Sequence, residues 1–166
     1  MKSRKFAIAD LRISAKAKRN VNRVLNDNRL SYGRFTEKFE RNFAKIHRRK
    51  FAIVANSGTS GLHVALHALK ETYNWEDEDE VLVPAITFIA SSNVIIHNNL
   101  KPVFVDVESD YYCIDPKKIE EKITEKTRAI IPVHLFGQSA DMVKILKIAK
   151  KYKLKILEDS CETMFV

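Results

Sequence analysis

The chain has 166 residues, which is enough for one domain with a substantial core, and its hydrophobic content of 45% is typical of globular proteins rather than disordered ones. It contains no run of 18 apolar residues and no charged-then-apolar leader, so the sequence predicts neither a membrane span nor a signal peptide and favours a soluble, cytoplasmic protein. The two isolated cysteines, Cys113 and Cys161, predict neither a metal site nor a disulfide framework.

The net charge of +8 is unevenly distributed along the chain. Residues 1–50 contain 16 Lys and Arg against 4 Asp and Glu, whereas residues 51–166 carry a net charge of −4. A basic front end is compatible with a nucleic-acid or acidic partner. Its charges, however, are interspersed with apolar residues at helical spacing, which favours two amphipathic helices with solvated outer faces. No nucleic-acid motif is recognisable, so a nucleic-acid-binding or regulatory module on a degenerate enzyme scaffold is kept as an alternative hypothesis only.

The hydrophobic pattern predicts two N-terminal helices, over 14–27 and 36–48, followed by strands that alternate with helices. The predicted strands are 51–55, 80–83, 102–105, 128–132 and 155–158, and the predicted helices are 59–72, 88–98, 116–122 and 141–152. This alternation implies right-handed crossovers and a mostly parallel sheet covered on both faces. We therefore expect an α/β three-layer sandwich over residues 51–166, preceded by a helical segment over residues 1–50, with ligands at the carboxyl ends of the strands.

A turn of small residues, 56–61, directly follows the apolar run 51–55 and opens a helical pattern. A strand, a turn and a helix N-terminus in succession direct unpaired N–H groups and the positive end of the helix dipole at one point, and the hydroxyls of Ser57, Thr59 and Ser60 add donors. The pattern is typical of a phosphate site. A plain N-cap with a tight glycine turn has the same pattern, so these residues alone leave both interpretations open.

Chemistry-bearing residues also follow the last two predicted strands. Glu158 and Asp159 come after the fifth strand, at the sheet edge where Gly58 and Thr59 are expected. A carboxylate there would attract a cation, although Asp159 could equally be an ordinary helix N-cap. His134 follows the fourth strand, and a histidine in such a place is more often held by backbone groups than catalytic.

Taken in order, six segments resemble the sugar aminotransferases of the DegT/DnrJ/EryC1/StrS family, which use pyridoxal 5'-phosphate (PLP) and have the aspartate-aminotransferase fold (fold type I). The segments are 30–33 with the helix around Phe39 and Glu40, 55–63, 83–88, 101–106, 133–137 and 157–159. The resemblance implies that residues 51–166 are part of the large PLP-binding domain, without its C-terminal part and without the small domain.

The resemblance also assigns cofactor-binding residues. Gly58, Thr59 and Ser60 match the residues that bind the cofactor phosphate in this family, which agrees with the anion-binding site expected at the helix N-terminus. Phe88 matches the aromatic residue that stacks on the pyridine ring, although simple core packing would also explain it. Asp159 matches the carboxylate that faces the pyridine nitrogen and keeps it protonated.

Two departures from the family pattern bear on activity. The lysine that forms the internal Schiff base would lie beyond Val166, so no residue of this chain is assigned as catalytic and we expect no transaminase turnover from it alone. Glu162 stands where the family usually has Gln or His beside the cofactor's phenolic oxygen. The segment 158–162 is similar to the PLP-dependent sugar 3-dehydratases, in which histidine replaces the lysine.

The resemblance therefore implies the N-terminal portion of an aminotransferase that acts on a nucleotide-linked keto-deoxysugar in deoxyamino sugar and polysaccharide biosynthesis. The implied partners are the nucleotide-sugar substrate, an amino-acid donor and a second copy in a homodimer. A sugar 3-dehydratase is the first alternative, because the deciding position lies beyond Val166. A further alternative is that this chain is a structural partner, which only stabilises or regulates an active paralogue.

Overall fold

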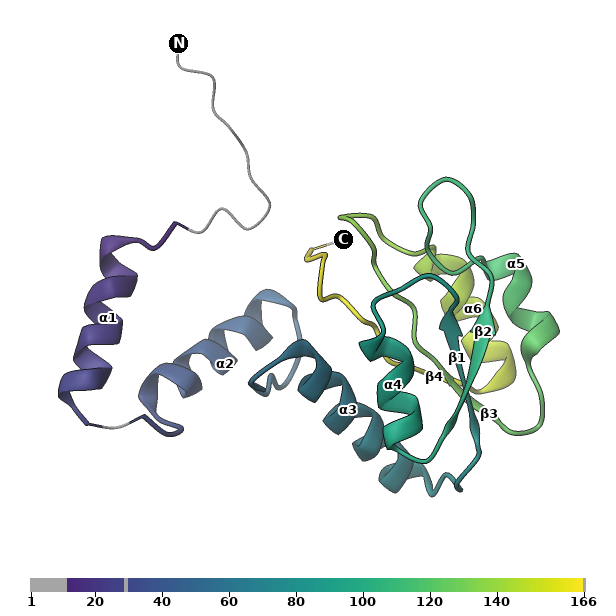
Figure 1. The fold of residues 1–166 in the computed structure, drawn as a ribbon, viewed down its shortest axis with the longest axis horizontal. Coiled ribbons are helices and arrows are strands. Elements are labelled where there is room, and N and C mark those ends of the chain that lie inside the picture. Colours follow the sequence, from purple (N-terminus) through teal and green to yellow (C-terminus); the bar gives the residue numbers. More distant parts are fainter. Residues whose placement is uncertain (1–11, 29, 166) are drawn as a thin grey trace, which may run out of the picture. The chain divides into compact units, whose positions relative to one another are not determined.

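The computed structural model describes residues 12–28 and 30–165, which divide into two compact units. The first unit ends at Ile53 and the second begins at Val54. Figure 1 shows two helices in the first unit and a sheet with flanking helices in the second. Within the described residues, no helix combines the length and the apolar character that crossing a membrane requires.

The first unit confirms the two predicted N-terminal helices, α1 (Ala15–Asn26) and α2 (Arg34–Ile46). Ser14 caps α1, because its hydroxyl accepts a hydrogen bond from the N–H of Ala17 at 3.1 Å. Gly33 occupies the N-cap position of α2. No residue of α1 is buried, whereas α2 buries Ala44 and leaves Phe39 and Ile46 exposed.

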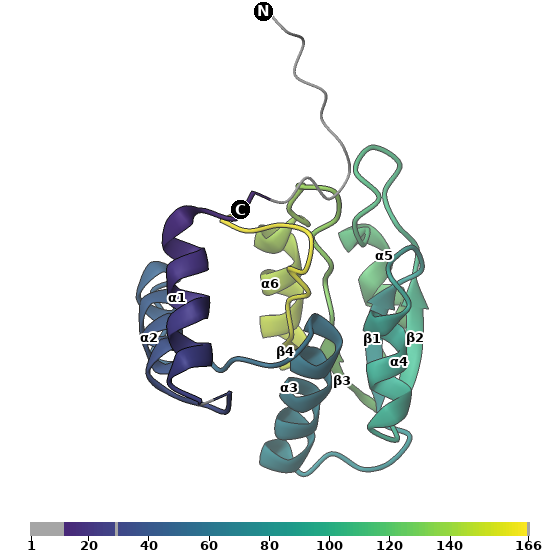
Figure 2. The ribbon, with the colours of Figure 1, turned by 60° about the vertical axis from the view of Figure 1, so that its left-hand side comes forward.

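The second unit is built on a four-stranded sheet in the order β2-β1-β3-β4, and all neighbouring strands run parallel. The strands are β1 (Glu80–Pro84), β2 (Lys101–Val105), β3 (Thr127–Ile130) and β4 (Lys155–Ile156). The helices are α3 (Gly58–Tyr73), α4 (Ala90–His97), α5 (Pro116–Ile119) with a 3₁₀ turn at Glu120–Lys122, and α6 (Met142–Tyr152). The predicted parallel α/β fold is confirmed (Figures 1 and 2).

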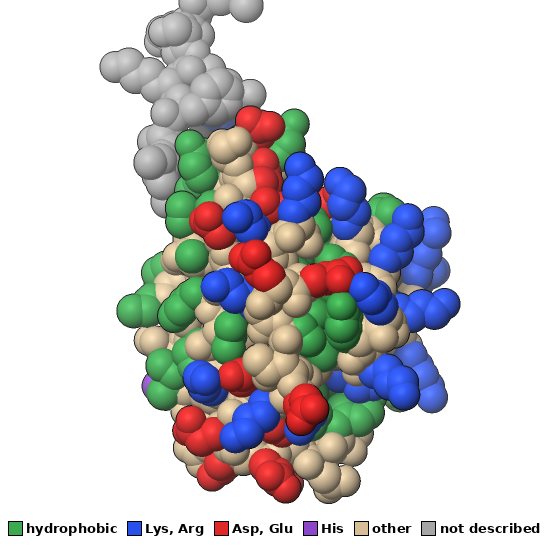
Figure 3. Space-filling model, turned by 90° about the vertical axis from the view of Figure 1, so that its right-hand side faces the viewer, with side chains coloured by type: hydrophobic (Ala, Val, Ile, Leu, Met, Phe, Trp, Pro, Cys, Tyr) green, Lys and Arg blue, Asp and Glu red, His purple; other side chains and the backbone are tan. Residues whose placement is uncertain are grey.

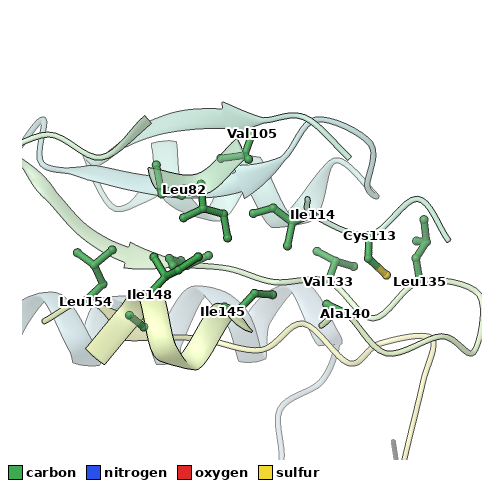
Figure 4. Close-up of a cluster of buried hydrophobic side chains, with 13 residues drawn as sticks. Leu82, Val105, Cys113, Ile114, Val133, Leu135, Ala140, Ile145, Ile148 and Leu154 are labelled. Atoms are coloured by element: carbon green, nitrogen blue, oxygen red, sulfur yellow. The ribbon is translucent and has the colours of Figure 1, made fainter. Parts of the chain in front are cut away.

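Two hydrophobic clusters, one on each face of the sheet, make this unit a three-layer sandwich. Successive strand residues point to opposite faces, so Val81 and Val83 pack with α3 and α4 while Leu82 packs with α5 and α6. Figure 4 shows the cluster that contains Leu82, in which this side chain of β1 faces Ile145 of α6. Because both faces are covered, the central strand β1 is buried along its whole length.

The predicted strand at 51–55 is wrong. These residues form no strand, and the side chains of Phe51 and Ile53 are 73% and 86% exposed. An apolar run becomes a strand only where a neighbouring strand supplies hydrogen-bond partners, and no described strand lies in register with it. The segment is therefore exposed instead of buried in the sheet.

The fifth predicted strand, 155–158, is shorter than expected, because β4 ends at Ile156. Its neighbour β3 is followed by Pro132, which has no N–H to donate to a ladder. Pairing then resumes as an isolated parallel bridge between Val133 and Asp159. The bridge holds the two segments together past the carboxyl end of the sheet.

Ionic side chains of both signs are interspersed on the face of the molecule drawn in Figure 3. On α6, Lys144 pairs with Asp141 at 2.7 Å, and Lys151 pairs with Glu120 at 2.7 Å. Such exposed pairs contribute little to stability, and we interpret this helix as an ordinary solvated outer layer.

Candidate functional site

A cavity of about 290 Å³ opens at the carboxyl end of the sheet, where the N-terminus of α3 meets the loops that follow β1, β3 and β4. Both predicted ends of the site, Gly58 with Thr59 and the carboxylate Asp159, line this one cavity. The lining residues are Gly58, Thr59, Leu62, Thr87, Phe88, Ala90, Val133, Leu135, Asp159, Cys161 and Glu162.

The N-terminus of α3 provides free donors. Ser57 is the N-cap, and its hydroxyl oxygen accepts the N–H of Ser60 at 3.1 Å. Its carbonyl accepts the N–H of Gly61, so the N–H groups of Gly58 and Thr59 are left without an acceptor among the described residues. Two such groups at a helix N-terminus suit an anion. Ser60 does not line the cavity, because its hydroxyl turns back to the Ser57 hydroxyl at 3.0 Å.

Gly58 is favoured by a close approach of the chain rather than by its backbone conformation. A Cβ atom at this position would lie 2.6 Å from the Cys161 Sγ atom. The N-terminus of α3 with its two free N–H groups, which we call the cradle, is therefore closed on one side by the segment that follows β4. Desolvation of the thiol, together with the Asp159 carboxylate beside it, raises the pKa of Cys161 to about 11.

Asp159 is buried, with 4% of its surface exposed, and its carboxylate is fixed from two sides. One oxygen accepts a hydrogen bond from the Ser91 hydroxyl at 2.7 Å, and the other accepts the N–H of Cys161 at 3.2 Å. The N-cap alternative for Asp159 is wrong, since residues 160–165 form no helix. A buried carboxylate without a basic side chain in contact suits a ligand that supplies a positive charge.

Glu162 acts together with Thr163 to hold a strained turn. Phe136 and Gly137 both have positive φ angles, 52° and 82°. The N–H of Phe136 donates to the Glu162 carboxylate at 3.1 Å, and the N–H of Gly137 donates to the Thr163 hydroxyl at 3.0 Å. The Thr163 hydroxyl in turn donates to the carbonyl of His134. These bonds join the loops after β3 and β4 into one wall of the cavity.

His134 is part of the same wall and is buried. Its Nδ1 atom lies 3.2 Å from the N–H of Ala140 and accepts that hydrogen bond, so Nδ1 carries no proton. The proton is therefore on Nε2, which donates to the Glu158 carboxylate at 3.1 Å. His134 orients the loop and does not line the cavity.

Phe88 lies in the loop between β1 and α4, at the cavity lining, and is 70% exposed. Core packing does not explain a side chain with so much of its surface in water. An exposed aromatic face beside a cavity suits a flat ring ligand.

The residues present fit PLP. This group carries a phosphate, for which the N–H groups of Gly58 and Thr59 are free, and a ring nitrogen that can be cationic, for which Asp159 is placed. Apolar side chains between them, Leu62, Val133 and Leu135, suit the ring. None of the described residues that line the cavity is a lysine.

Comparison with known proteins decides the family. The family model for the DegT/DnrJ/EryC1/StrS aminotransferase family matches residues 11–165. The chain belongs to this family. Members of the DegT/DnrJ/EryC1/StrS family are PLP-dependent.

Two curated members of the family match most of the chain. The GDP-perosamine synthase of Caulobacter vibrioides is 42% identical over 81% of this chain and 35% of its own length. The dTDP-3-amino-3,6-dideoxy-alpha-D-galactopyranose transaminase of Aneurinibacillus thermoaerophilus is 41% identical over 92% of this chain and 41% of its own length. The chain therefore spans about two fifths or less of the length of these relatives.

A solved structure supports the same fold. The GDP-4-keto-6-deoxy-D-mannose-3-dehydratase of E. coli, solved with bound hydrated PLP, superposes with a TM-score of 0.89 at 26% identity and covers 96% of this chain and 42% of that one. The α/β fold expected for a DegT/DnrJ/EryC1/StrS protein is thus shown.

Sequence reasoning missed three residues that build the site: Ser91, Cys161 and Thr163. Ser91 holds the Asp159 carboxylate, Cys161 closes the cradle at Gly58, and Thr163 fixes the turn at Gly137. Each acts on a residue distant in sequence, so no local spacing reveals it. A weak signal exists for Ser91, which follows Thr87 by one helical turn and so places two hydroxyls on one side of the chain.

Proposed function

We propose that this chain is the N-terminal part of a PLP-dependent aminotransferase that acts on a nucleotide-linked keto-deoxysugar with an amino acid as amino donor. One observation carries the proposal: a single cavity is lined at one side by the free N–H groups of Gly58 and Thr59 and at another by the buried carboxylate Asp159. Family membership, and the transaminase activity of the Aneurinibacillus thermoaerophilus relative, agree with it.

Each residue then has a defined task. The N–H groups of Gly58 and Thr59 would bind the phosphate, and the exposed Phe88 ring would pack on the pyridine ring. The negative charge of Asp159 would favour a proton on the ring nitrogen. When bound, PLP supplies the electron sink that amino transfer requires.

Catalysis needs a group that this cavity does not provide. Transamination on PLP uses a lysine that attaches the aldehyde and moves a proton, and no described lysine lines the cavity. We therefore propose that the 166-residue chain binds PLP reversibly and does not transaminate alone. Borohydride treatment of the complex, followed by mass spectrometry, should give no cofactor fixed to a specific lysine. A single fixed lysine would contradict this part of the proposal.

The binding test uses the whole chain with PLP and the Asp159→Asn variant. Loss of the carboxylate should weaken PLP binding by a factor on the order of ten or more, because a hydrogen bond to a charged group is lost. Asp110→Asn is the matched control, since Asp110 is exposed and lies outside the cavity. A wild-type chain that does not bind PLP, or an Asp159→Asn variant that binds it as tightly as wild type, would overturn the proposed site.

A sugar 3-dehydratase is the second candidate. The E. coli protein whose structure superposes with a TM-score of 0.89 is a 3-dehydratase. Two acidic residues, Asp159 and Glu162, also line the cavity of this chain. The two candidates use the same PLP site and differ in the residue that would stand in the lysine position, histidine in the dehydratase. The homodimer and the cytoplasmic location stay predictions of the sequence.

A further inference from the structure

Three oxygen-bearing side chains form a continuous hydrogen-bonded row beneath the cavity. The Thr87 and Ser91 hydroxyls lie 3.0 Å apart, and the Ser91 hydroxyl lies 2.7 Å from the Asp159 carboxylate. Ser91 is completely buried on α4, one turn after Thr87, and it reaches a carboxylate 68 residues later in the chain. The row therefore connects the loop after β1 to the loop after β4.

The direction of the hydrogen bonds follows from the chemistry of the three groups. An ionised carboxylate can only accept, so the single hydroxyl proton of Ser91 is donated to Asp159. The Ser91 oxygen is then left as an acceptor, and the bond from Thr87 must carry the Thr87 proton. Donation runs from Thr87 to Ser91 to Asp159, and consecutive bonds of this kind strengthen one another in a buried setting.

We propose that Ser91 is a positioning residue that would hold the Asp159 carboxylate directed at the ring nitrogen of the cofactor, with Thr87 supporting it. This inference rests on the proposed function, because it concerns the same cavity. The Ser91 hydrogen bond fixes one of the two carboxylate oxygens, and the negative charge would stabilise a cationic ring nitrogen only while the carboxylate stays directed at it. Ser91 thereby sets how firmly that nitrogen keeps its proton.

Other groups near the Asp159 carboxylate do not replace its hydrogen bond with Ser91. The titratable side chains that share the cavity with Asp159 are the Cys161 thiol and the Glu162 carboxylate. Glu162 is held by the N–H of Phe136 on the opposite loop. Cys161 contacts Asp159 both through its own N–H and through its thiol, and a substitution at Ser91 leaves both contacts in place.

The test measures the protonation of the ring nitrogen directly. PLP labelled with ¹⁵N at that position is bound to the whole chain, and its ¹⁵N chemical shift is followed against pH. We compare wild type with Ser91→Ala, Ser91→Thr, Thr87→Val and Asp159→Asn. Ser92→Ala is the matched control, because Ser92 is the next residue on α4 and its hydroxyl bonds to the carbonyl of Ile89 instead.

The expected order is graded. The midpoint at which the nitrogen loses its proton should fall most in Asp159→Asn, less in Ser91→Ala and least in Thr87→Val, while Ser92→Ala matches wild type. PLP affinity should fall about tenfold in Ser91→Ala. Ser91→Thr keeps the donor and should restore the wild-type midpoint even if the added methyl group lowers stability.

The outcomes separate the two proposals. If wild type binds no PLP, the proposed function fails. If wild type binds PLP and Asp159→Asn shifts the midpoint but Ser91→Ala does not, the role of Ser91 is refuted while the site stands. The midpoint is read only on the folded protein with PLP bound. If Ser91→Ala lowers stability but keeps the wild-type midpoint, Ser91 has a structural role only, and the proposed positioning role is refuted.

Discussion

A Cβ atom introduced at Gly58 tests the packing of the cradle at its tightest point. In Gly58→Ala the new atom would lie 2.6 Å from the Cys161 Sγ atom, whereas an ordinary contact measures 3.4–4 Å. Overpacking costs about 1–3 kcal/mol, and the clashing sulfur can rotate about χ1, so the lower end of about 1 kcal/mol applies. Alanine in place of glycine in a helix returns about 0.5 kcal/mol. We expect Gly58→Ala to lower the free energy of unfolding by about 0.5 kcal/mol.

Gly58→Ala should raise the free energy of unfolding when the Cys161 sulfur atom is absent. In a Cys161→Ala background the next atom, the Cβ of residue 161, lies at 3.9 Å and causes no clash. Gly58→Ala should then stabilise the protein by about 0.5 kcal/mol, which gives a coupling energy of about 1 kcal/mol in the double-mutant cycle.

Urea unfolding, followed by the fluorescence of the single tryptophan, Trp75, measures all four proteins of the cycle. Trp75 is buried in the core beside α3, so its emission reports on the unit that contains Gly58. An effect of Gly58→Ala that is equal in both backgrounds, with a coupling below about 0.3 kcal/mol, would refute the close approach of Cys161.

Three further predictions concern other parts of the second unit. The raised pKa of Cys161, about 11 against a reference of 9.0, lowers its thiolate fraction at pH 8 about a hundredfold, and since a thiolate of higher pKa is the stronger nucleophile, its alkylation should be slowed about tenfold relative to an unperturbed thiol, with the rate rising up to about pH 11; a rate equal to that of a free thiol contradicts this. The Thr124 hydroxyl and then Lys101 lower the pKa of the buried Glu80 below its ordinary value of 4.5. Its stabilising contribution is therefore present above pH 4.5 and is lost as pH falls through the lowered pKa, so Glu80→Gln should flatten the loss of stability in acid, measured as the urea midpoint against pH. An unchanged pH profile would speak against it. Leu66→Ala, at a fully buried position of α3, should cost about 2–5 kcal/mol in urea unfolding, whereas Val64→Ala, 60% exposed on the same helix, should cost less than about 0.5 kcal/mol; similar losses at both positions would contradict the packing.

The sheet and the two ends of the site were predictable because both depend on local signals. Strand and helix periods are visible in the chain, and parallel strands bring their carboxyl ends to one edge, so the acid at Asp159 could be expected there. The turn at Gly58 was expected at the same edge because it follows 51–55, but this segment forms no strand and the N-terminus of α3 places Gly58 in the cavity instead. That expectation agrees with the cavity they share.

What the sequence could not predict depends on contacts between distant segments. The contact of Ser91 with Asp159 spans 68 residues, and no period in the chain links the two. The apolar run at 51–55 has the composition of a strand but lacks a neighbouring strand among the described residues. Ser60 was expected among the phosphate-binding residues, yet its hydroxyl forms a hydrogen bond with the Ser57 hydroxyl and does not line the cavity.

The decisive measurement is a crystal structure of the chain grown with PLP. We expect the phosphate within hydrogen-bond distance of the N–H groups of Gly58 and Thr59, and the ring nitrogen against the Asp159 carboxylate. PLP bound at any other place, or bound in this cavity with its ring nitrogen directed away from Asp159, would show that the turn and the acid do not form one cofactor site.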